Sequence, residues 1–233
     1  MWRAAAIALV LTSAQAGAES ITSARYDDPT TRYAHGVLGD AIEHGALVVE
    51  TDQGRRLKFV LPQSRVFEDT EPRVVDVDGD GDAEVIVVES DARRGARLAV
   101  YDQTGLIAAN DYIGQRNRWL APAGVGAADL DGDGQIELVF VDRPHLAKTL
   151  RIYEFRAGEL LLEASFQAVT NHRIGERDIA CGIRTCAGAP EVIVADADWR
   201  EVLAIRWDGT RFDVDRLGPH QGRESFARAM ACQ

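Results

Sequence analysis

The chain has 233 residues, 46% of them hydrophobic, which is enough for one well-buried core within a single domain. The formal net charge is −11, and Lys58 and Lys148 are the only lysines among 26 basic residues. This acidic balance argues against nucleic acid and against an anionic membrane surface as partners.

Residues 1–18 have the composition of a secretory signal peptide. A basic start is followed by an apolar run from Ala4 to Leu11 and by small residues from Ala14 to Ala18, as cleavage requires. The run is too short to span a membrane, and no later stretch reaches the roughly 18 apolar residues of a transmembrane helix. We therefore expect an exported protein, periplasmic or extracellular, without a stable membrane anchor.

The rest of the chain reads as short strands separated by Gly- and Asp-containing turns every 8–12 residues, which predicts an all-β fold. Residues 19–32 are polar and form a leader or a weak first strand, and residues 218–233 form a tail in which 223–231 has the one helical pattern. Strands are expected near 33–38, 46–51, 56–61, 65–68, 73–77, 84–89, 96–102, 106–113, 124–130, 136–142, 149–155, 160–166, 174–180, 191–196, 201–207 and 211–216.

One nine-residue stretch occurs twice, at 76–84 and, 53 residues later, at 129–137. In both copies acidic residues occupy positions 1, 3, 5 and 9, and glycines at positions 4 and 6 allow the positive φ of a tight loop. The acidic residues at these positions are Asp76, Asp78, Asp80 and Glu84 in the first copy and Asp129, Asp131, Asp133 and Glu137 in the second.

Four carboxylates brought together on a short loop repel one another unless a cation lies between them. A set of oxygen ligands alone favours Ca²⁺ over a transition metal. An EF-hand is excluded, because position 12 is Val87 in one copy and Phe140 in the other, and strand-like sequence follows both. The alternative is a pair of acidic turns that hold no lasting ion.

These stretches resemble the D-x-D-G-D-G-x-x-[DE] loop of the FG-GAP/VCBS repeats of integrin-like β-propellers. The resemblance implies two Ca²⁺ sites, each completed by a backbone carbonyl, that of Asp82 in the first loop and of Gln135 in the second. The family more often has Asp at position 9, where this chain has Glu in both copies. The resemblance extends over about residues 33–217.

Weaker copies of the repeat suggest a small β-propeller of about four four-stranded blades, each near 50 residues long. One begins at Asp178, 49 residues after Asp129, and has lost the acids at positions 3 and 5; another lies near 39–50. Cys181 and Cys186 fall in the degenerate copy, where a disulfide between them would replace the ion. The alternative pairing joins Cys232 to one of them.

The sequence favours an accessory role over catalysis. No nucleophile elbow, metalloprotease or phosphate-binding motif occurs, and carboxylates that hold calcium are unavailable for proton transfer. We expect a non-catalytic calcium-binding module that binds a partner protein or a glycan, with calcium in a structural role. The alternative is a glycan lyase or hydrolase, which would need a polar cluster on one face outside the calcium loops. Convergence of His172, Arg173 and Glu176 with an acid from another blade would favour it.

Overall fold

The computed structural model describes residues 19–33, 35–114, 119–186 and 188–233. The signal peptide expected at 1–18 lies outside these residues. The described chain is all-β apart from one eight-residue helix, and its strands form three antiparallel sheets of eight, four and five strands. None of the three sheets closes into a barrel.

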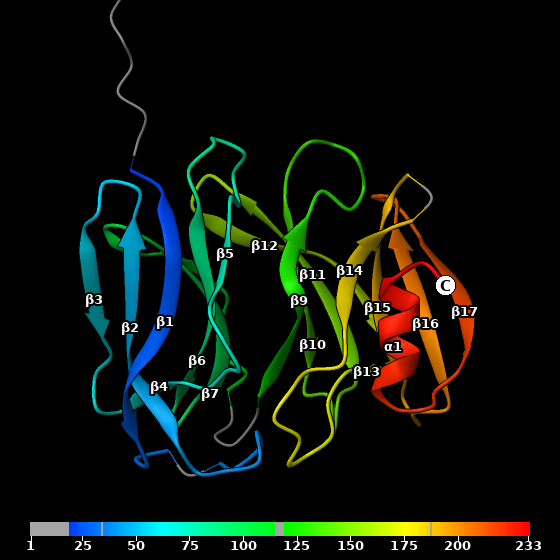
Figure 1. Ribbon diagram of the computed structural model, residues 1–233, viewed down its shortest axis with the longest axis horizontal. Helices are drawn as coiled ribbons and strands as arrows, with labels where there is room; N and C mark the ends of the chain where they lie inside the picture. The colour runs from blue at the N-terminus through cyan, green and yellow to red at the C-terminus, as the bar shows by residue number, and fades with distance from the viewer. Residues whose placement is uncertain (1–18, 34, 115–118, 187) are drawn as a thin grey trace, which may run out of the picture.

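The strands fall into four consecutive groups, which lie side by side in chain order (Figure 1). The first group is β1 (Ile21–Thr30), β2 (Glu43–Thr51) and β3 (Arg56–Val60), and the second is β5 (Arg73–Val75), β6 (Glu84–Asp91), β7 (Gly95–Asp102) and β8 (Gly105–Ala109). The third is β9 (Leu120–Ala128), β10 (Glu137–Asp142), β11 (Thr149–Arg156) and β12 (Glu159–Gln167). The fourth is β13 (Val169–Thr170), β14 (Gly182–Thr185), β15 (Pro190–Asp196), β16 (Glu201–Trp207) and β17 (Phe212–Pro219), followed by the helix α1 (Arg223–Met230).

Four groups give three sheets because β4 (Arg65–Phe67) joins the first group to the second. It pairs with β2 through His44 and Phe67, and with β6 along its whole length. The predicted units of four strands are therefore not four separate sheets.

Residues 19–32, expected as a leader or a weak first strand, contain β1, whose mostly polar sequence is held by pairing with β2 along nearly its whole length. Two of the predicted strands are wrong. The strands expected at 33–38 and 174–180 are turns and irregular chain in the described residues. The second of these lies between β13 and β14, which pair instead with β15.

The core lies between neighbouring groups. Buried side chains such as Leu47 and Val87 pack the first group against the second, Leu98 and Phe140 pack the second against the third, and other apolar residues pack the third against the fourth. Among the described residues, no strand of the first group pairs with a strand of the fourth; the two groups meet only through the segments between β1 and β2 and between β13 and β14, where the N–H of Gly175 donates to the carbonyl of Val37 at 2.9 Å. The groups therefore form a row with two ends.

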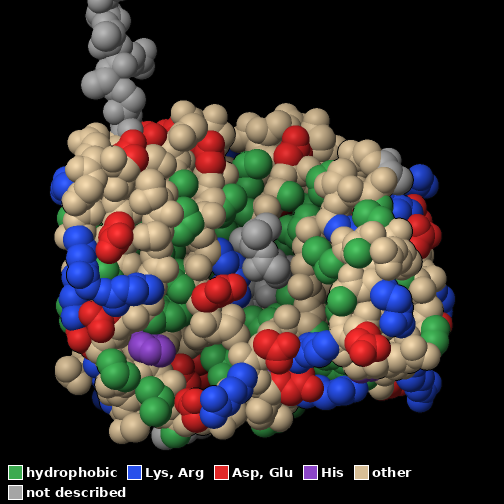
Figure 2. Space-filling view, viewed as in Figure 1, with side chains coloured by type: hydrophobic (Ala, Val, Ile, Leu, Met, Phe, Trp, Pro, Cys, Tyr) green, Lys and Arg blue, Asp and Glu red, His purple; other side chains and the backbone are tan. Residues whose placement is uncertain are grey.

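Each end of the row is covered differently. Phe226 and Ala229 of α1 pack on Ile193 and Ala204 of the fourth group, and the helix lies over this sheet (Figure 1). At the other end, Lys58 pairs with Asp27 at 3.1 Å, and basic side chains gather at the edge formed by the first group (Figure 2). No helix in the described part of the chain is long and apolar enough to cross a membrane.

Candidate metal centres

The first acidic loop joins β5 to β6 and folds around the side chain of Asp76. Its two carboxylate oxygens accept the backbone N–H groups of Gly79 at 2.7 Å and Gly81 at 3.0 Å. Both glycines have positive φ, 73° and 94°, a conformation that side chains disfavour. Glu84, the first residue of β6, reaches back and accepts the N–H of Val77 at 3.0 Å. The loop is thus wrapped by its own carboxylates.

The second loop, between β9 and β10, repeats these bonds at the equivalent residues. Asp129 accepts the N–H groups of Gly132 at 2.8 Å and Gly134 at 3.2 Å, and Glu137 accepts that of Leu130 at 2.6 Å. The two loops therefore have one geometry, as their identical acid and glycine spacing predicts.

Three predicted ligands converge in each loop. The carboxylate oxygens of Asp76, Asp78 and Glu84 lie within 4.8 Å of one another, as do those of Asp129, Asp131 and Glu137. The fourth acids, Asp80 and Asp133, lie outside these sets. Each accepts a backbone N–H within its loop, that of Asp82 at 2.8 Å and that of Gln135 at 2.7 Å.

The electrostatics of both loops favour a cation. Burial, followed by the neighbouring loop aspartates, raises the pKa of Glu84 to about 7. Burial, followed by nearby acidic residues, also raises the pKa of Glu137 to about 7. Burial and its acidic neighbours also raise the pKa of Asp78. Within the described residues, no lysine or arginine pairs with these carboxylates. The oxygen-only donor sets therefore fit a hard cation such as Ca²⁺.

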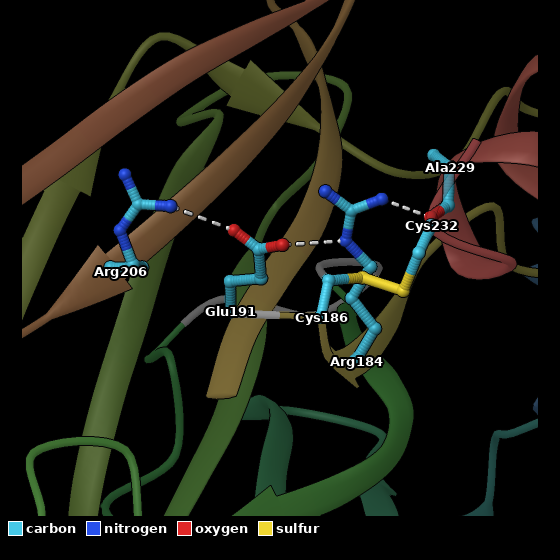
Figure 3. Close-up of a disulfide and its surroundings, with 6 residues drawn as sticks. All are labelled: Arg184, Cys186, Glu191, Arg206, Ala229 and Cys232. Atoms are coloured by element: carbon cyan, nitrogen blue, oxygen red, sulfur yellow. Dashed lines mark hydrogen bonds and ion pairs between the residues drawn. A yellow bond between two sulfur atoms is a disulfide. The ribbon is translucent and has the colours of Figure 1, made fainter. Parts of the chain in front are cut away.

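In the degenerate third copy, the charge of the glutamate at position 9, Glu191, is balanced by arginines. Glu191, at the start of β15, accepts Arg184 of β14 at 2.7 Å and Arg206 of β16 at 3.0 Å (Figure 3). Arg184 also donates to the backbone carbonyl of Ala229 at the end of α1. Two protein cations thus neutralise the carboxylate in the copy that lacks the other acids.

In the two acidic copies, the strand positions equivalent to Arg184 and Arg206 carry no basic residue. In the first copy, Glu84 pairs with Val75 on β5. On its other side, Val85 pairs with Tyr101, which places Asp102 of β7 beside Glu84. Beside Glu137 the pairing residues are Ala128 on β9 and Glu154 on β11. Where the third copy has two arginines, the first and second copies each have one apolar and one acidic residue. This contrast was invisible in the sequence alone, because it depends on strand register.

The disulfide predicted between Cys181 and Cys186 is wrong. Cys186 instead pairs with Cys232, the alternative partner, across 46 residues of sequence (Figure 3). The docking of α1 on the fourth group brings Cys232 to Cys186, with Cα atoms 5.7 Å apart. Cys181 lies outside this disulfide, where its sulfur accepts Nδ2–H of Asn171 at 3.5 Å.

Within the described chain, His172, Arg173 and Glu176 do not converge with an acid from another group, the arrangement that would favour an enzyme. His172 is buried, and its Nε2 donates to the backbone carbonyl of Glu176 at 2.9 Å. Its Nδ1 therefore accepts from Nε2 of His145 at 3.0 Å, so both ring nitrogens are used. Arg173 lies 3.9 Å from Glu176, whose carboxylate accepts Arg223 at 2.6 Å. Among the described residues, no acid from another group is bonded to His172.

One neighbour of the second loop was missed in the sequence. Gly209, in the β16–β17 turn, has φ 80°, and a Cβ atom there would lie 2.9 Å from Oδ2 of Asp131. The fourth group thus approaches the second acidic loop closely. A conspicuous Asp-Gly turn was the only sequence signal, and it predicted a hairpin.

Two comparisons with known proteins concern the repeat and the fold. Residues 76–140, which include both loops, match the FG-GAP-like repeat family. Among solved structures, the fold is similar to that of the exotype rhamnogalacturonan lyase YesX, with a TM-score of 0.51 at 17% identity. The alignment covers 88% of this chain and 50% of the lyase, so the chain spans about half the length of that protein. No curated protein matches.

Proposed function

We propose that this protein is an exported calcium-binding module of the β-propeller type. Asp76, Asp78, Asp80 and Glu84, with the carbonyl of Asp82, would hold one Ca²⁺ ion. The second set would be Asp129, Asp131, Asp133 and Glu137, with the carbonyl of Gln135. The observation that carries this proposal is the internal contrast with Glu191, which has two arginines where the loop glutamates have none.

In this proposal, the four strand groups are four propeller blades arranged in an open row. The FG-GAP-like match over 76–140 and the similarity to half of a longer chain support it. Each loop enters the central strand of its group, β6 or β10, both of which are fully buried. A bound ion would therefore hold in place the entry to a core strand.

The role of calcium in this proposal is structural. The ligands of each site come together only when the loop is folded, so the ion stabilises the native state by mass action. Bound calcium would also neutralise part of the −11 charge of the chain. The module itself would bind a protein or a glycan without catalysis, because its convergent acids are committed to the ion and His172 to hydrogen bonds.

Thermal unfolding with calcium and after chelation tests the proposal. At a calcium concentration about 100-fold above Kd, each site contributes about 2.7 kcal/mol to the stability of the native state. We expect calcium to raise the Tm of the parent and to leave that of an Asp78→Ala, Asp131→Ala double variant unchanged. A parent that binds no calcium by mass spectrometry of the native protein, with no change in Tm, would contradict it.

An enzyme acting on glycans is the second candidate, favoured by one observation, the similarity to a rhamnogalacturonan lyase. Incubation of the calcium-loaded protein with rhamnogalacturonan, followed by absorbance of unsaturated products, separates the two candidates. Steady product release that depends on protein concentration would establish the enzyme and reject the non-catalytic role.

A further inference from the structure

A groove lies between the second and third strand groups, on the side formed by their outer strands β8 and β12. It consists of a cavity of about 600 Å³ and a smaller one of about 200 Å³, both lined by Asn110, Asp111, Tyr153 and Leu162. Because these four residues are shared, the two cavities form one continuous groove. It is separate from the calcium loops and from the histidine pair.

The floor of the groove is a rigid aromatic surface. Tyr153 stacks on the buried Phe140, with ring centroids 5.6 Å apart and planes 16° from parallel. One ring face is therefore covered, while the residue stays half-buried and lines both cavities. Leu162, which pairs with Tyr153 across β11 and β12, is 51% exposed. Together the exposed part of Tyr153, whose other side packs on the core, and Leu162 offer an apolar platform to the groove.

Comparison with the second group shows that this platform is not a requirement of the repeat. Tyr101 pairs with Leu106 across β7 and β8 as Tyr153 pairs with Leu162. Tyr101 is buried, however, and donates its hydroxyl to Glu89 at 2.5 Å. The equivalent tyrosines therefore differ: Tyr101 of the second group is buried in the core, and Tyr153 of the third group lines an open groove.

Fixed polar groups surround the platform. Oδ1 of Asn110 accepts the N–H of Leu98 at 2.7 Å, which fixes the amide and leaves its two Nδ2 protons as donors. Asp111 is exposed and forms no hydrogen bond or ion pair within the described residues. Arg143 and Arg151 both donate to the carboxylate of Asp142, so their guanidinium groups are held at the rim. The rim therefore contains both donors and an acceptor.

These features select the class of ligand. The volume lies in the range of pockets that bind small ligands. The arginines share Asp142, and Asp111 and Glu159 add negative charge, so the groove does not favour an anion. A purely apolar ligand would leave the rim unsatisfied. A pyranose offers an apolar C–H face to the tyrosine ring and hydroxyls that both donate and accept.

We propose that this groove binds an uncharged oligosaccharide, with Tyr153 and Leu162 as its platform and Asn110 and Asp111 as hydroxyl partners. The inference deepens the proposed function, since it places the glycan site of the interaction module. It is independent of calcium occupancy, because neither loop contributes a residue to the groove.

Isothermal titration calorimetry on the full chain with calcium tests the proposal. The probes are short cello-, xylo-, manno- and galacto-oligosaccharides, with an oligogalacturonide as the charged comparison. We expect one of the uncharged probes to bind and its affinity to fall at least about tenfold in Tyr153→Ala and in Leu162→Arg, which fills the groove. Leu106→Arg, at the equivalent exposed position of β8, is the matched control and should bind like the parent.

Sugar binding that persists in Leu162→Arg would show that the groove is not the binding site and that the glycan binds elsewhere on the module. Binding of the oligogalacturonide alone, or of none of the probes, would overturn the proposal itself. A calcium-dependent rise in Tm together with no sugar binding would reject this inference and retain the calcium sites. The Tm of each variant, measured beside the parent, shows that a lost signal is not a lost fold.

Discussion

Arg206 donates to the carboxylate of Glu191 at 3.0 Å from the neighbouring strand. Together with Arg184 it supplies, from the protein, the positive charge that the two acidic loops lack. A buried carboxylate that loses a partner is left with an uncompensated charge, which is more costly than the absence of the pair. The third copy should therefore depend on its arginines as, under the proposed function, the first two copies would depend on a bound ion.

Replacing Arg184 by Met tests this equivalence. We expect a loss of about 3 kcal/mol in the free energy of unfolding, equal with and without calcium, because Glu191 and the end of α1 both lose a donor. Urea unfolding measures it. Arg216→Gln removes an ion pair with Glu201 in which the arginine is largely exposed, and should cost little. A calcium-dependent loss in Arg184→Met would reject the equivalence.

Gly209→Ala should weaken the second calcium site alone. The new methyl group would lie 2.9 Å from Oδ2 of Asp131 and displace that ligand, while the first loop is untouched. Gly54→Ala is the matched control, since its φ of 75° imposes similar strain but no atom lies within 4 Å of the added carbon. Calcium titration should resolve one weakened site in Gly209→Ala and two normal sites in Gly54→Ala. Equal affinities in both variants would contradict the expected contact.

Removal of the Cys186–Cys232 disulfide should destabilise the protein strongly. A loop of 46 residues corresponds to about 4 kcal/mol in the chain-entropy description of the unfolded state. We expect Cys186→Ser to unfold at lower urea concentration, and Cys181→Ser to retain the disulfide. Peptide mapping under non-reducing conditions identifies the linked cysteines, and a Cys181–Cys186 peptide would refute the pairing seen here.

Glu43 should impose a pH dependence on stability. Burial, followed by the nearby Glu68, Asp40 and Asp69, raises the pKa of Glu43 to about 9. The folded state therefore holds this proton where the unfolded chain has released it, so stability falls as pH rises from about 4.5 to about 9.

Glu43→Gln removes this dependence. We expect the variant to have a Tm several degrees above the parent near pH 8 and the same Tm as the parent near pH 4, where the parent carboxyl is protonated in both states. Glu50→Gln, on the exposed side of the same strand, is the control. Thermal scans at both pH values measure the difference, and a variant no more stable than the parent near pH 8 would show that Glu43 is ionised in the fold.

The sequence predicted features that depend on neighbouring residues, such as the acidic loops, but it did not predict pairings between residues that lie far apart in the chain. The wrapped loops follow from acids and glycines within nine residues, so a tight loop was predicted at both copies, although only three of the four acids converge in each. β1 was missed because its polar sequence gains order only from pairing with β2. The partner of Cys186 depends on where α1 docks, and the arginines around Glu191 depend on the register of three strands. Such information is tertiary and has no local signature.

The helix α1 has a consequence for assembly. It occupies the apolar face of the fourth group, with Phe226 and Ala229 over Ile193 and Ala204, so no further sheet can be added there. In stacked repeat proteins the terminal repeats need a polar outer face for solubility, because the apolar face of each repeat is otherwise buried by its neighbour. By covering that face, the C-terminal helix gives the fourth group the kind of cap that the terminal units of repeat proteins carry.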